Sequence, residues 1–322
     1  MHIVLVGPGA LGCLLASHIT KGIESTTDTR LTILDYNSDR ASKLTKQGIV
    51  YNINDRSEPI PVSVISAPEL IDHPDVILLC VKSYTVQDCL TFCSPIINGN
   101  SLLIFMQNGI GHLQEYPNLK GITTAYGTTT EGATLLGAGH VRHAGSGVTY
   151  LGFLKQPPIQ FTELLTKIIA VFSGGGLQTH YAEDILSRLW AKLFINVGIN
   201  ALTAILNCKN GEILTLPGIA QRMQMAVGEA RLIADKNNIA IVDDPYQTAR
   251  IVCKKTAENI SSMLQDVRNE RRTEIDAING AIVKLGKTLD IDTPENNRLC
   301  EQIRQIEATY GKVDNGKTNK KP

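Results

Sequence analysis

The first half of the sequence alternates short apolar runs with longer stretches of mixed polarity. The apolar runs are rich in aliphatic and β-branched residues and read as buried strands: Ile3–Val6, Leu31–Leu34, Val76–Val81, Leu102–Met106 and Thr123–Tyr126. Several of them are followed directly by loops of glycine, serine or asparagine. Because strands separated by helical segments are typical of βαβ units, this pattern predicts a parallel sheet with crossover helices.

The second half has a helical pattern. From about Ala182 onward, apolar residues recur every three or four positions, beginning with Ile185, Leu189, Leu193 and Val197. Between the halves, the glycine- and threonine-rich stretch 127–152 contains the alternating run Val148–Leu151. This stretch predicts an antiparallel extension or a hairpin at the edge of the sheet.

Together the patterns predict an α/β fold class and two domains, for which 322 residues are sufficient. We expect a parallel-sheet domain over 1–183 and an all-helical domain over 184–311. The last residues, 312–322, are polar and lysine-rich, which predicts a disordered tail without chemistry.

Composition narrows the possible partners. Lys+Arg and Asp+Glu both number 31, so the net charge is zero and no overall field favours nucleic acid or an anionic membrane. Apolar runs such as Val76–Val81 and Ser101–Met106 fall far short of the roughly 20 residues that cross a bilayer, which predicts no membrane span. The start of the sequence lacks a signal-peptide pattern, and the seven cysteines are scattered. We therefore expect a cytoplasmic protein with no metal site.

The residues after the first predicted strand fit the pattern G-x-G-x-x-G: Gly7, Pro8, Gly9, Ala10, Leu11 and Gly12. In a strand–turn–helix setting the first glycine permits the tight turn, the second lets the backbone approach a pyrophosphate, and the third lets helix and strand pack closely. A helix predicted from Ala10 to about Ile19 would direct its N-terminus toward the phosphates. This turn predicts a Rossmann-type dinucleotide-binding domain.

Polar residues at the carboxyl ends of the predicted strands should line one crevice of the sheet, and they follow Gly7 as Asp35, Lys82 and Asn108. Asp35 can accept hydrogen bonds from the adenosine ribose and would repel a 2′-phosphate, which favours NAD(H). In the alternative interpretation, Asp35 caps a turn and Arg40 supplies a phosphate partner.

A polar stripe interrupts the first apolar helix of the second half. Lys192, Asn196 and Asn200 are spaced by four, so they share one helix face. Burying them without partners would cost roughly 1–3 kcal/mol for each neutral group and more for the charge. The stripe therefore predicts a polar ligand, with Lys192 able to protonate a developing alkoxide. A solvent-facing stripe is the alternative. A second polar stretch, 258–266, is ambiguous by itself, because its Ser and Asn residues are also typical helix caps.

These features together resemble the ketopantoate reductase (2-dehydropantoate 2-reductase) family over nearly the whole chain. The matching pieces are Gly7–Gly12, Lys82, Gln107–Gly109, Gly127–Thr130, Trp190–Leu193, Asn196, Asn200–Ala204, Asn207–Glu212, Glu258–Asp266 and Thr273–Gly280. The resemblance implies hydride transfer from NADP(H) to 2-dehydropantoate, giving (R)-pantoate on the route to coenzyme A. At Asp35 the sequence departs from the enterobacterial enzyme, which has an arginine suited to the 2′-phosphate of NADP(H), so NAD(H) is an alternative cofactor.

The resemblance also implies roles for single residues. It implies that Lys192 is the proton donor and that the carboxylate of Glu274 is a second catalytic group. Implied cofactor contacts beyond the glycine turn are Lys82, Asn108, Ala133 and Glu274, in addition to Asp35, which its position after the second predicted strand indicates. Implied substrate contacts are Asn108, Lys192, Asn196, Asn200 and Asn210, with Asn259 and Ser262 at the substrate's carboxylate end.

Two other functions remain open from the sequence. Asp35 would suit an NAD-dependent D-2-hydroxyacid dehydrogenase acting on a bulkier substrate, against which the three asparagines Asn196, Asn200 and Asn210 argue. A non-catalytic dinucleotide sensor is a further alternative, against which Lys192 and Glu274 argue. The sequence leaves monomer and homodimer equally open.

Overall fold

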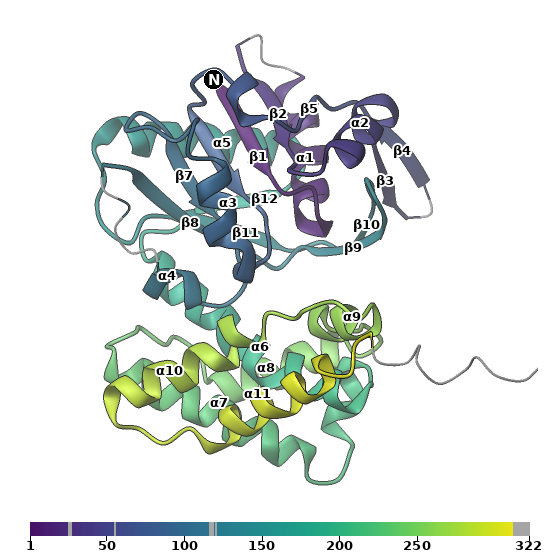
Figure 1. Ribbon diagram of the computed structural model, residues 1–322. Coiled ribbons are helices and arrows are strands. Elements are labelled where there is room, and N and C mark those ends of the chain that lie inside the picture. Colours follow the sequence, from purple (N-terminus) through teal and green to yellow (C-terminus); the bar gives the residue numbers. More distant parts are fainter. Residues whose placement is uncertain (25–27, 55, 116–118, 120, 312–322) are drawn as a thin grey trace, which may run out of the picture. The chain divides into compact units, whose positions relative to one another are not determined.

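The computed structural model describes residues 1–24, 28–54, 56–115, 119 and 121–311, so the predicted tail at 312–322 lies outside the described residues. The chain forms two compact units. Unit 1 comprises Met1–Gln107 and His112–Leu189, and unit 2 comprises Asn108–Gly111 and the residues from Trp190 onward (Figure 1). The predicted domain limits, 1–183 and 184–311, stay a prediction.

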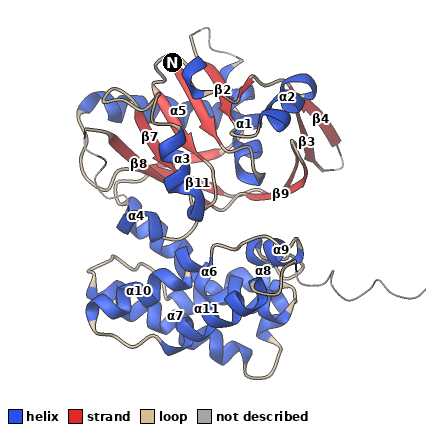
Figure 2. Cartoon of the chain, in the orientation of Figure 1, coloured by secondary structure: helices blue, strands red, loops and turns tan. Residues whose placement is uncertain are grey.

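Unit 1 holds every strand found among the described residues (Figure 2). The strands are β1 (His2–Val6), β2 (Arg30–Leu34), β3 (Ile49–Ile53), β4 (Arg56–Ile60), β5 (Val64–Ile65), β6 (Val76–Leu79), β7 (Leu102–Phe105), β8 (Thr123–Thr129), β9 (Gly132–Gly137), β10 (His140–Gly145), β11 (Val148–Gly152) and β12 (Gln178–Tyr181). Its helices are α1 (Ala10–Ile23), α2 (Ser38–Gln47), α3 (Val86–Phe92), α4 (Gly111–Glu115) and α5 (Ile159–Gly174). The first residue of α4 belongs to unit 2.

The main sheet has the order β12-β11-β8-β7-β6-β1-β2-β5. Its strands pair in parallel except for the antiparallel pair β11–β8. The six strands from β5 to β8 follow the order of the dinucleotide-binding fold. The parallel sheet predicted from the apolar runs is therefore confirmed, and all five predicted strands are present within a few residues of their expected limits.

The glycine- and threonine-rich stretch 127–152 contributes to two sheets. β11 extends the main sheet antiparallel to β8, as expected. The hairpin of β9 and β10 lies elsewhere, in a four-stranded sheet of order β4-β3-β10-β9. In that sheet β10 pairs in parallel with β3, a long-range pairing that local alternation could not indicate.

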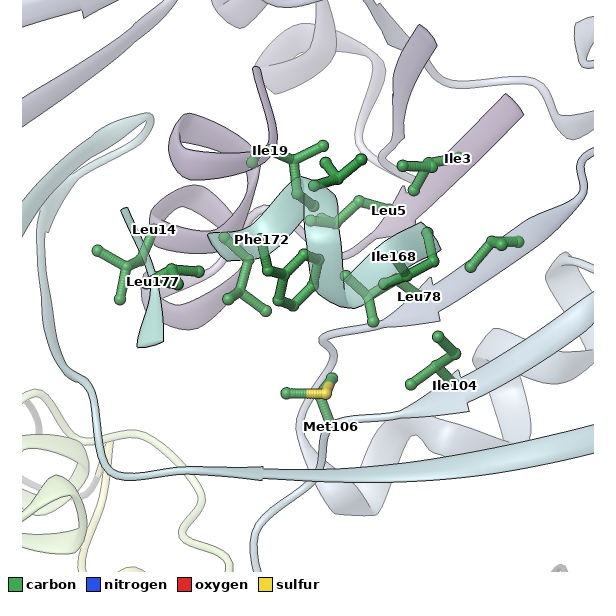
Figure 3. Packing of buried hydrophobic residues seen from close by; sticks show 14 of the residues in the cluster. Ile3, Leu5, Leu14, Ile19, Leu78, Ile104, Met106, Ile168, Phe172 and Leu177 are labelled. Atoms are coloured by element: carbon green, nitrogen blue, oxygen red, sulfur yellow. The ribbon is translucent and has the colours of Figure 1, made fainter. Parts of the chain in front are cut away.

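The core of unit 1 lies where α1 and α5 pack against the main sheet (Figure 3). Fully buried strand residues meet apolar side chains of both helices, among them Ile3, Leu5, Leu78, Ile104, Leu14, Ile19, Ile168 and Phe172. Each large aliphatic side chain buried in this way stabilises the fold by about 1.5–3 kcal/mol. This packing fixes α1 on the sheet and with it the turn between β1 and α1.

A buried polar chain lies beside this core. Glu131 Oε2 is 2.6 Å from His143 Nε2, and His143 Nδ1 is 2.9 Å from the Tyr51 hydroxyl. That hydroxyl is 3.1 Å from His18 Nε2, and His18 Nδ1 is 2.7 Å from the Gly175 carbonyl oxygen. Burial lowers the pKa of His18 and raises that of Tyr51 to about 12. The chain joins α1, β3 and β10 through polar contacts inside unit 1.

Unit 2 consists of helices joined by loops, with no strand among its described residues (Figure 2). Its helices are α6 (Ile185–Leu206, which begins in unit 1), α7 (Ile219–Lys236), α8 (Pro245–Lys255), α9 (Ser262–Arg268), α10 (Asn279–Leu289) and α11 (Pro294–Glu307), with short 3₁₀ turns at Asn210–Leu214 and Ile275–Ala277. α7, α10 and α11 pack on one another, and α8 packs on α7 and on the Asn210–Leu214 turn. The helical second half is thus confirmed.

α6 is long and apolar enough to cross a membrane by length and composition alone. However, 67% of its most apolar stretch is buried inside the structure, which is how the core helix of a folded unit behaves. Its periodicity predicts the helix, but it contains no uninterrupted apolar run of that length because Lys192, Asn196 and Asn200 break its apolar sequence.

Candidate functional site

The glycine turn sits directly after the buried strand β1. Gly7 has a φ of +91°, and a Cβ there would lie 2.6 Å from Val81 Cγ1. Its amide donates to the Leu34 carbonyl at 3.2 Å, and the Gly9 amide donates back to the Gly7 carbonyl at 2.8 Å. Only glycine fits this conformation at so close an approach. The first glycine therefore makes the tight turn that the motif predicts.

The other two glycines differ in what surrounds them. A Cβ on Gly12 would lie 2.1 Å from the Gly7 carbonyl oxygen, so this position must be bare for α1 to pack on the turn. A Cβ on Gly9 would meet no protein atom within 4 Å. Gly9 is also the N-cap of α1 and gives that helix no side-chain cap. Open space over uncapped helix amides fits the pyrophosphate of a dinucleotide.

The residue after β2 has a partner of its own. Asp35 is 1% exposed, and its carboxylate accepts two hydrogen bonds from the Arg40 guanidinium, each 2.5 Å long. The Asn37 amide donates to the same carboxylate at 3.1 Å. The bond to Asp35 raises the pKa of Arg40. The geometry contains the turn cap proposed as an alternative for Asp35, and it also places an arginine beside the carboxylate.

Two further predicted cofactor contacts belong to unit 1. Lys82 is the N-cap of a short 3₁₀ turn that follows β6, and it is partly exposed. Ala133 lies in β9, opposite His143 of β10, and β9 packs against α1. Gly7, Asp35 and Lys82 follow three neighbouring parallel strands, β1, β2 and β6, so they share the carboxyl edge of the sheet.

Sequence reasoning gave no role to Gln107, the next residue in this region. Its side-chain amide donates to the carbonyl oxygens of Leu79 and Val81, at 2.9 and 3.1 Å, and so ties the ends of β6 and β7 together. Its Oε1 atom is buried and has no hydrogen-bond partner among the described residues. A glutamine directly after a buried strand, inside the motif Gln107–Gly109, was the available signal.

In unit 2, Lys192 is joined to two other predicted site residues. Its ammonium donates to Asn108 Oδ1 at 2.8 Å, and Asn108 Nδ2 donates to Glu274 Oε2 at 3.0 Å. The amide of Asn108 therefore bridges a cation and an anion, with each end of the amide facing the appropriate partner. Glu274 is only 5% exposed. Residues 108, 192 and 274, far apart in the sequence, thus form one hydrogen-bonded group.

The loop that carries Asn108 is docked on the segment after Glu274. Gly109 has a φ of +77°, and a Cβ there would lie 2.0 Å from the Ala277 carbonyl oxygen. The Ile110 amide donates to that same oxygen at 3.1 Å. Glycine at position 109 therefore permits the approach that sets Asn108 against Glu274.

The environment of Lys192 changes its acidity. Burial lowers the pKa of its ammonium to about 8, and the negative charge of Glu274 opposes this by raising it. A lysine with such a pKa is largely protonated at neutral pH yet gives up its proton more readily than an ordinary lysine. The group is chemically suited to donate a proton to an oxygen that gains negative charge.

The asparagines predicted to contact substrate are available for a ligand. Asn196 and Asn200 lie one and two turns beyond Lys192 on α6, and neither side chain makes a hydrogen bond to the described residues. Asn200 is nevertheless 7% exposed. Asn210 donates to the Thr256 hydroxyl at 2.9 Å, while its Oδ1 is buried and unpaired within the described part of the chain. Nearly buried amides carry a cost that a ligand or an ordered water molecule can offset.

The remaining two predicted substrate residues, Asn259 and Ser262, have exposed side chains in unit 2. They stand on either side of the buried Ser261, which is the N-cap of α9 and accepts a hydrogen bond from the Leu264 amide at 3.1 Å. The second polar stretch therefore does contain a helix cap, as its structural interpretation expected, and the cap is Ser261.

Comparison with known proteins gives a consistent result over both units. The family described as "Ketopantoate reductase PanE/ApbA" matches residues 3–156, and "Ketopantoate reductase PanE/ApbA C terminal" matches residues 184–307. A 2-dehydropantoate 2-reductase of Halobacterium salinarum is 30% identical over 308 residues, covering 94% of this chain and 98% of the relative.

Solved structures agree with this assignment. The PanE/ApbA family ketopantoate reductase from Ralstonia eutropha has a TM-score of 0.85 and 25% identity, covering 96% of this chain and 99% of that one. D-mandelate dehydrogenase in a ternary structure with NADH and anilino(oxo)acetate has a TM-score of 0.84 and 24% identity over 96% and 99% of the two chains, a likeness of fold. The chain belongs to the ketopantoate reductase family of NAD(P)H-dependent oxidoreductases.

Proposed function

We propose that this protein is a 2-dehydropantoate 2-reductase that uses NAD(P)H to reduce the 2-keto group and form (R)-pantoate. The observation that carries the proposal is the hydrogen-bonded group Lys192–Asn108–Glu274, together with the nearly buried amide of Asn200 on the same helix as Lys192. Relatives about 30% identical over nearly their full length support the choice of substrate. The proposal assigns the cofactor to unit 1 and the substrate to the polar groups of unit 2.

When bound, NAD(P)H would supply the hydride. The bare backbone of the glycine turn would hold the pyrophosphate on the amides at the start of α1. The Asp35–Arg40 pair would meet the adenosine ribose, where the carboxylate suits free hydroxyls and the guanidinium suits a 2′-phosphate.

Lys192 would hold the proton that the reduction consumes. As the keto oxygen gains negative charge, an ammonium oriented by Asn108 stabilises it more than the neutral ketone and then donates its proton to form the hydroxyl. Glu274 would act through Asn108 and through its charge, which keeps Lys192 protonated. Atoms balance, because one hydride and one proton convert a ketone to an alcohol.

Neutral side-chain amides would form hydrogen bonds with the substrate's hydroxyl group. Asn196, Asn200 and Asn210 can donate and accept hydrogen bonds without adding charge. A site built to bind a hydroxyl loses much of its transition-state binding when the hydroxyl is missing, because its own polar groups are then unpaired. We therefore expect a strong preference for a keto acid that carries the 4-hydroxyl.

The test is a substrate panel. It measures kcat/KM with NADPH and NADH for 2-dehydropantoate, for 3,3-dimethyl-2-oxobutanoate, which lacks only the 4-hydroxyl, and for phenylglyoxylate. We expect 2-dehydropantoate to be preferred by at least about 100-fold, the order of discrimination such a site can reach. Equal rates would contradict the proposal, a preference for phenylglyoxylate with NADH would favour the D-2-hydroxyacid dehydrogenase, and no turnover of any keto acid would favour the sensor.

A further inference from the structure

The polar stripe of α6 continues beyond the residues that sequence reasoning assigned. Thr203 lies three positions after Asn200 and eleven after Lys192, so it shares their helix face. Its side chain is fully buried, with 0% exposure. Its hydroxyl oxygen is 3.0 Å from the carbonyl oxygens of Ile199 and Asn200 in its own helix.

Thr203 also has a partner 58 positions further along the chain. The hydroxyls of Thr203 and Ser261 are hydrogen-bonded, with 2.7 Å between their oxygens. The Ser261 oxygen accepts at the same time from the Leu264 amide, at 3.1 Å, and so caps α9. Two buried hydroxyls therefore connect the stripe of α6 directly to the first turn of α9.

The side chains next to this connection differ in their exposure. Ser261 is 6% exposed and turned inward, while Ser262 after it and Asn259 two residues before it are exposed. The other end of the segment is tied by backbone bonds, from the Asn210 amide to the Asn259 carbonyl at 3.0 Å and from the Gly211 amide to the Ala257 carbonyl at 3.1 Å. The hydroxyl pair thus ties this segment to α6, in addition to these backbone bonds and to the bond of 3.4 Å from the Gln265 side-chain amide to the Ile260 carbonyl oxygen.

We infer that Thr203 is a positioning residue for substrate binding: through Ser261 it holds segment 259–262 in the register that presents Asn259 and Ser262 to the carboxylate end of the substrate. The inference rests on the proposed function for the roles of Asn259 and Ser262. Thr203 would thus contact neither reacting atom and would act by positioning the exposed side chains of Asn259 and Ser262. Losing one buried neutral hydrogen bond should therefore raise the KM for the substrate by about tenfold.

The kinetic test uses Thr203→Val, which keeps the shape and removes the hydroxyl, and Thr203→Ser, which restores it. The matched control is Thr288→Val on α10, where an exposed hydroxyl bonds only to the Lys284 carbonyl of its own helix, at 3.1 Å. KM and kcat are measured for the best keto acid of the panel. We expect Thr203→Val to raise the KM for the keto acid about tenfold, with kcat and the KM for the cofactor changed less than about twofold. Thr203→Ser should recover most of the loss, and Thr288→Val should change neither constant.

A second measurement is independent of the substrate. Hydrogen exchange of the Leu264 amide, compared with amides of α7, reports whether the start of α9 loosens on its own. We expect Thr203→Val to speed exchange at Leu264 while α7 and Tm stay close to wild type, and Thr203→Ser to restore protection. Unchanged exchange at Leu264, or a KM that rises equally in Thr203→Ser, would overturn the inference. If the panel shows no reduction of 2-dehydropantoate, the proposed function fails, and the exchange result still decides whether Thr203 positions the segment.

Discussion

The glycine turn of unit 1 and the polar stripe of unit 2 are built on opposite principles. The turn is defined by glycines, because its backbone lies close to Val81 and to its own helix, and the space over Gly9 is open. The stripe is defined by the presence of particular functional groups on a helix that is otherwise apolar. On the proposed function, unit 1 would bind through backbone geometry, which many chemistries share, while unit 2 would supply the groups that act on the substrate. Substitutions in the two regions should therefore fail in different ways.

The largest effect is expected at Lys192. Lys192→Ala should lower kcat by about 100-fold or more, because it removes the general acid, while the dissociation constant for the cofactor stays within about twofold. Steady-state kinetics and a cofactor titration measure the two quantities. The matched control is Lys287→Ala, an exposed lysine of α10. An active Lys192→Ala variant would show that Lys192 is not the proton donor and that the stripe of unit 2 does not carry the chemistry.

Two substitutions of the same size separate the structural role of the glycine turn from its proposed role in cofactor binding. Gly12→Ala places a Cβ 2.1 Å from the Gly7 carbonyl oxygen and should destabilise the fold by roughly 1–3 kcal/mol. Gly9→Ala meets no protein atom, so its Tm should stay near wild type, while its cofactor dissociation constant rises about tenfold, or about 1.4 kcal/mol. Thermal unfolding and cofactor titration separate the two. Tight cofactor binding by Gly9→Ala would show that no ligand lies over that glycine.

The ion pair of Asp35 and Arg40, which follows β2, should determine the preference between NADPH and NADH. Asp35→Asn removes the repulsion of a 2′-phosphate and releases Arg40, so the ratio of kcat/KM for NADPH to that for NADH should rise about tenfold, a typical magnitude for one charge-assisted contact. Arg40→Gln should lower the same ratio. A ratio unchanged in both variants would mean that the pair does not contact the ribose.

A smaller effect is expected from Glu274. Reduction needs protonated Lys192, so kcat should fall as the pH rises past about 8, the pKa to which burial lowers this lysine. Glu274 raises that pKa, hence Glu274→Gln should move the alkaline limb of the kcat profile to lower pH. The pH dependence of kcat for wild type and variant measures this shift. A limb that stays in place or moves to higher pH contradicts the role of Glu274.

The smallest effect concerns stability in unit 1 and should leave the chemistry untouched. Burial lowers the pKa of His18, so its contribution to stability is present above the unfolded value of about 6.5 and is lost as the pH falls below it. Between pH 7 and pH 5 the free energy of unfolding should fall less in His18→Asn than in wild type, by up to about 1.4 kcal/mol per pH unit. His73→Asn, at a side chain that is 89% exposed, serves as the control and should follow wild type. Equal slopes in all three proteins would contradict this.

Local patterns predicted most of the fold. The strands and the helical half were found because apolar periodicity is written in consecutive residues, and the glycine turn because its geometry excludes side chains. The stripe of α6 pointed to a polar ligand for the same reason. The family followed from motifs in both halves, and the comparisons confirm it.

Long-range partners could not be predicted in this way. Arg40 was weighed only as a phosphate partner, and its bidentate bond to Asp35 depends on how α2 begins at the Asn37 cap. The pair of Thr203 and Ser261 joins residues 58 positions apart, and no periodicity connects them. The second sheet likewise depends on β3 meeting β10 across most of unit 1. Each of these is a tertiary contact between two segments that are locally unremarkable.

The position of segment 108–111 in the sequence affects how the gene can be divided or recombined. The residue that orients Lys192 is encoded in the middle of unit 1 yet belongs to unit 2, so the chain passes between its units at 107/108, 111/112 and 189/190. A gene fragment that begins at codon 190 would encode the helical unit without Asn108. Exchange of helical halves between related genes would thus place this lysine against the corresponding loop of the other parent, so that loop must match the new helical unit. A single cut in the sequence therefore does not separate the two units, because segment 108–111 of unit 2 lies within the sequence of unit 1.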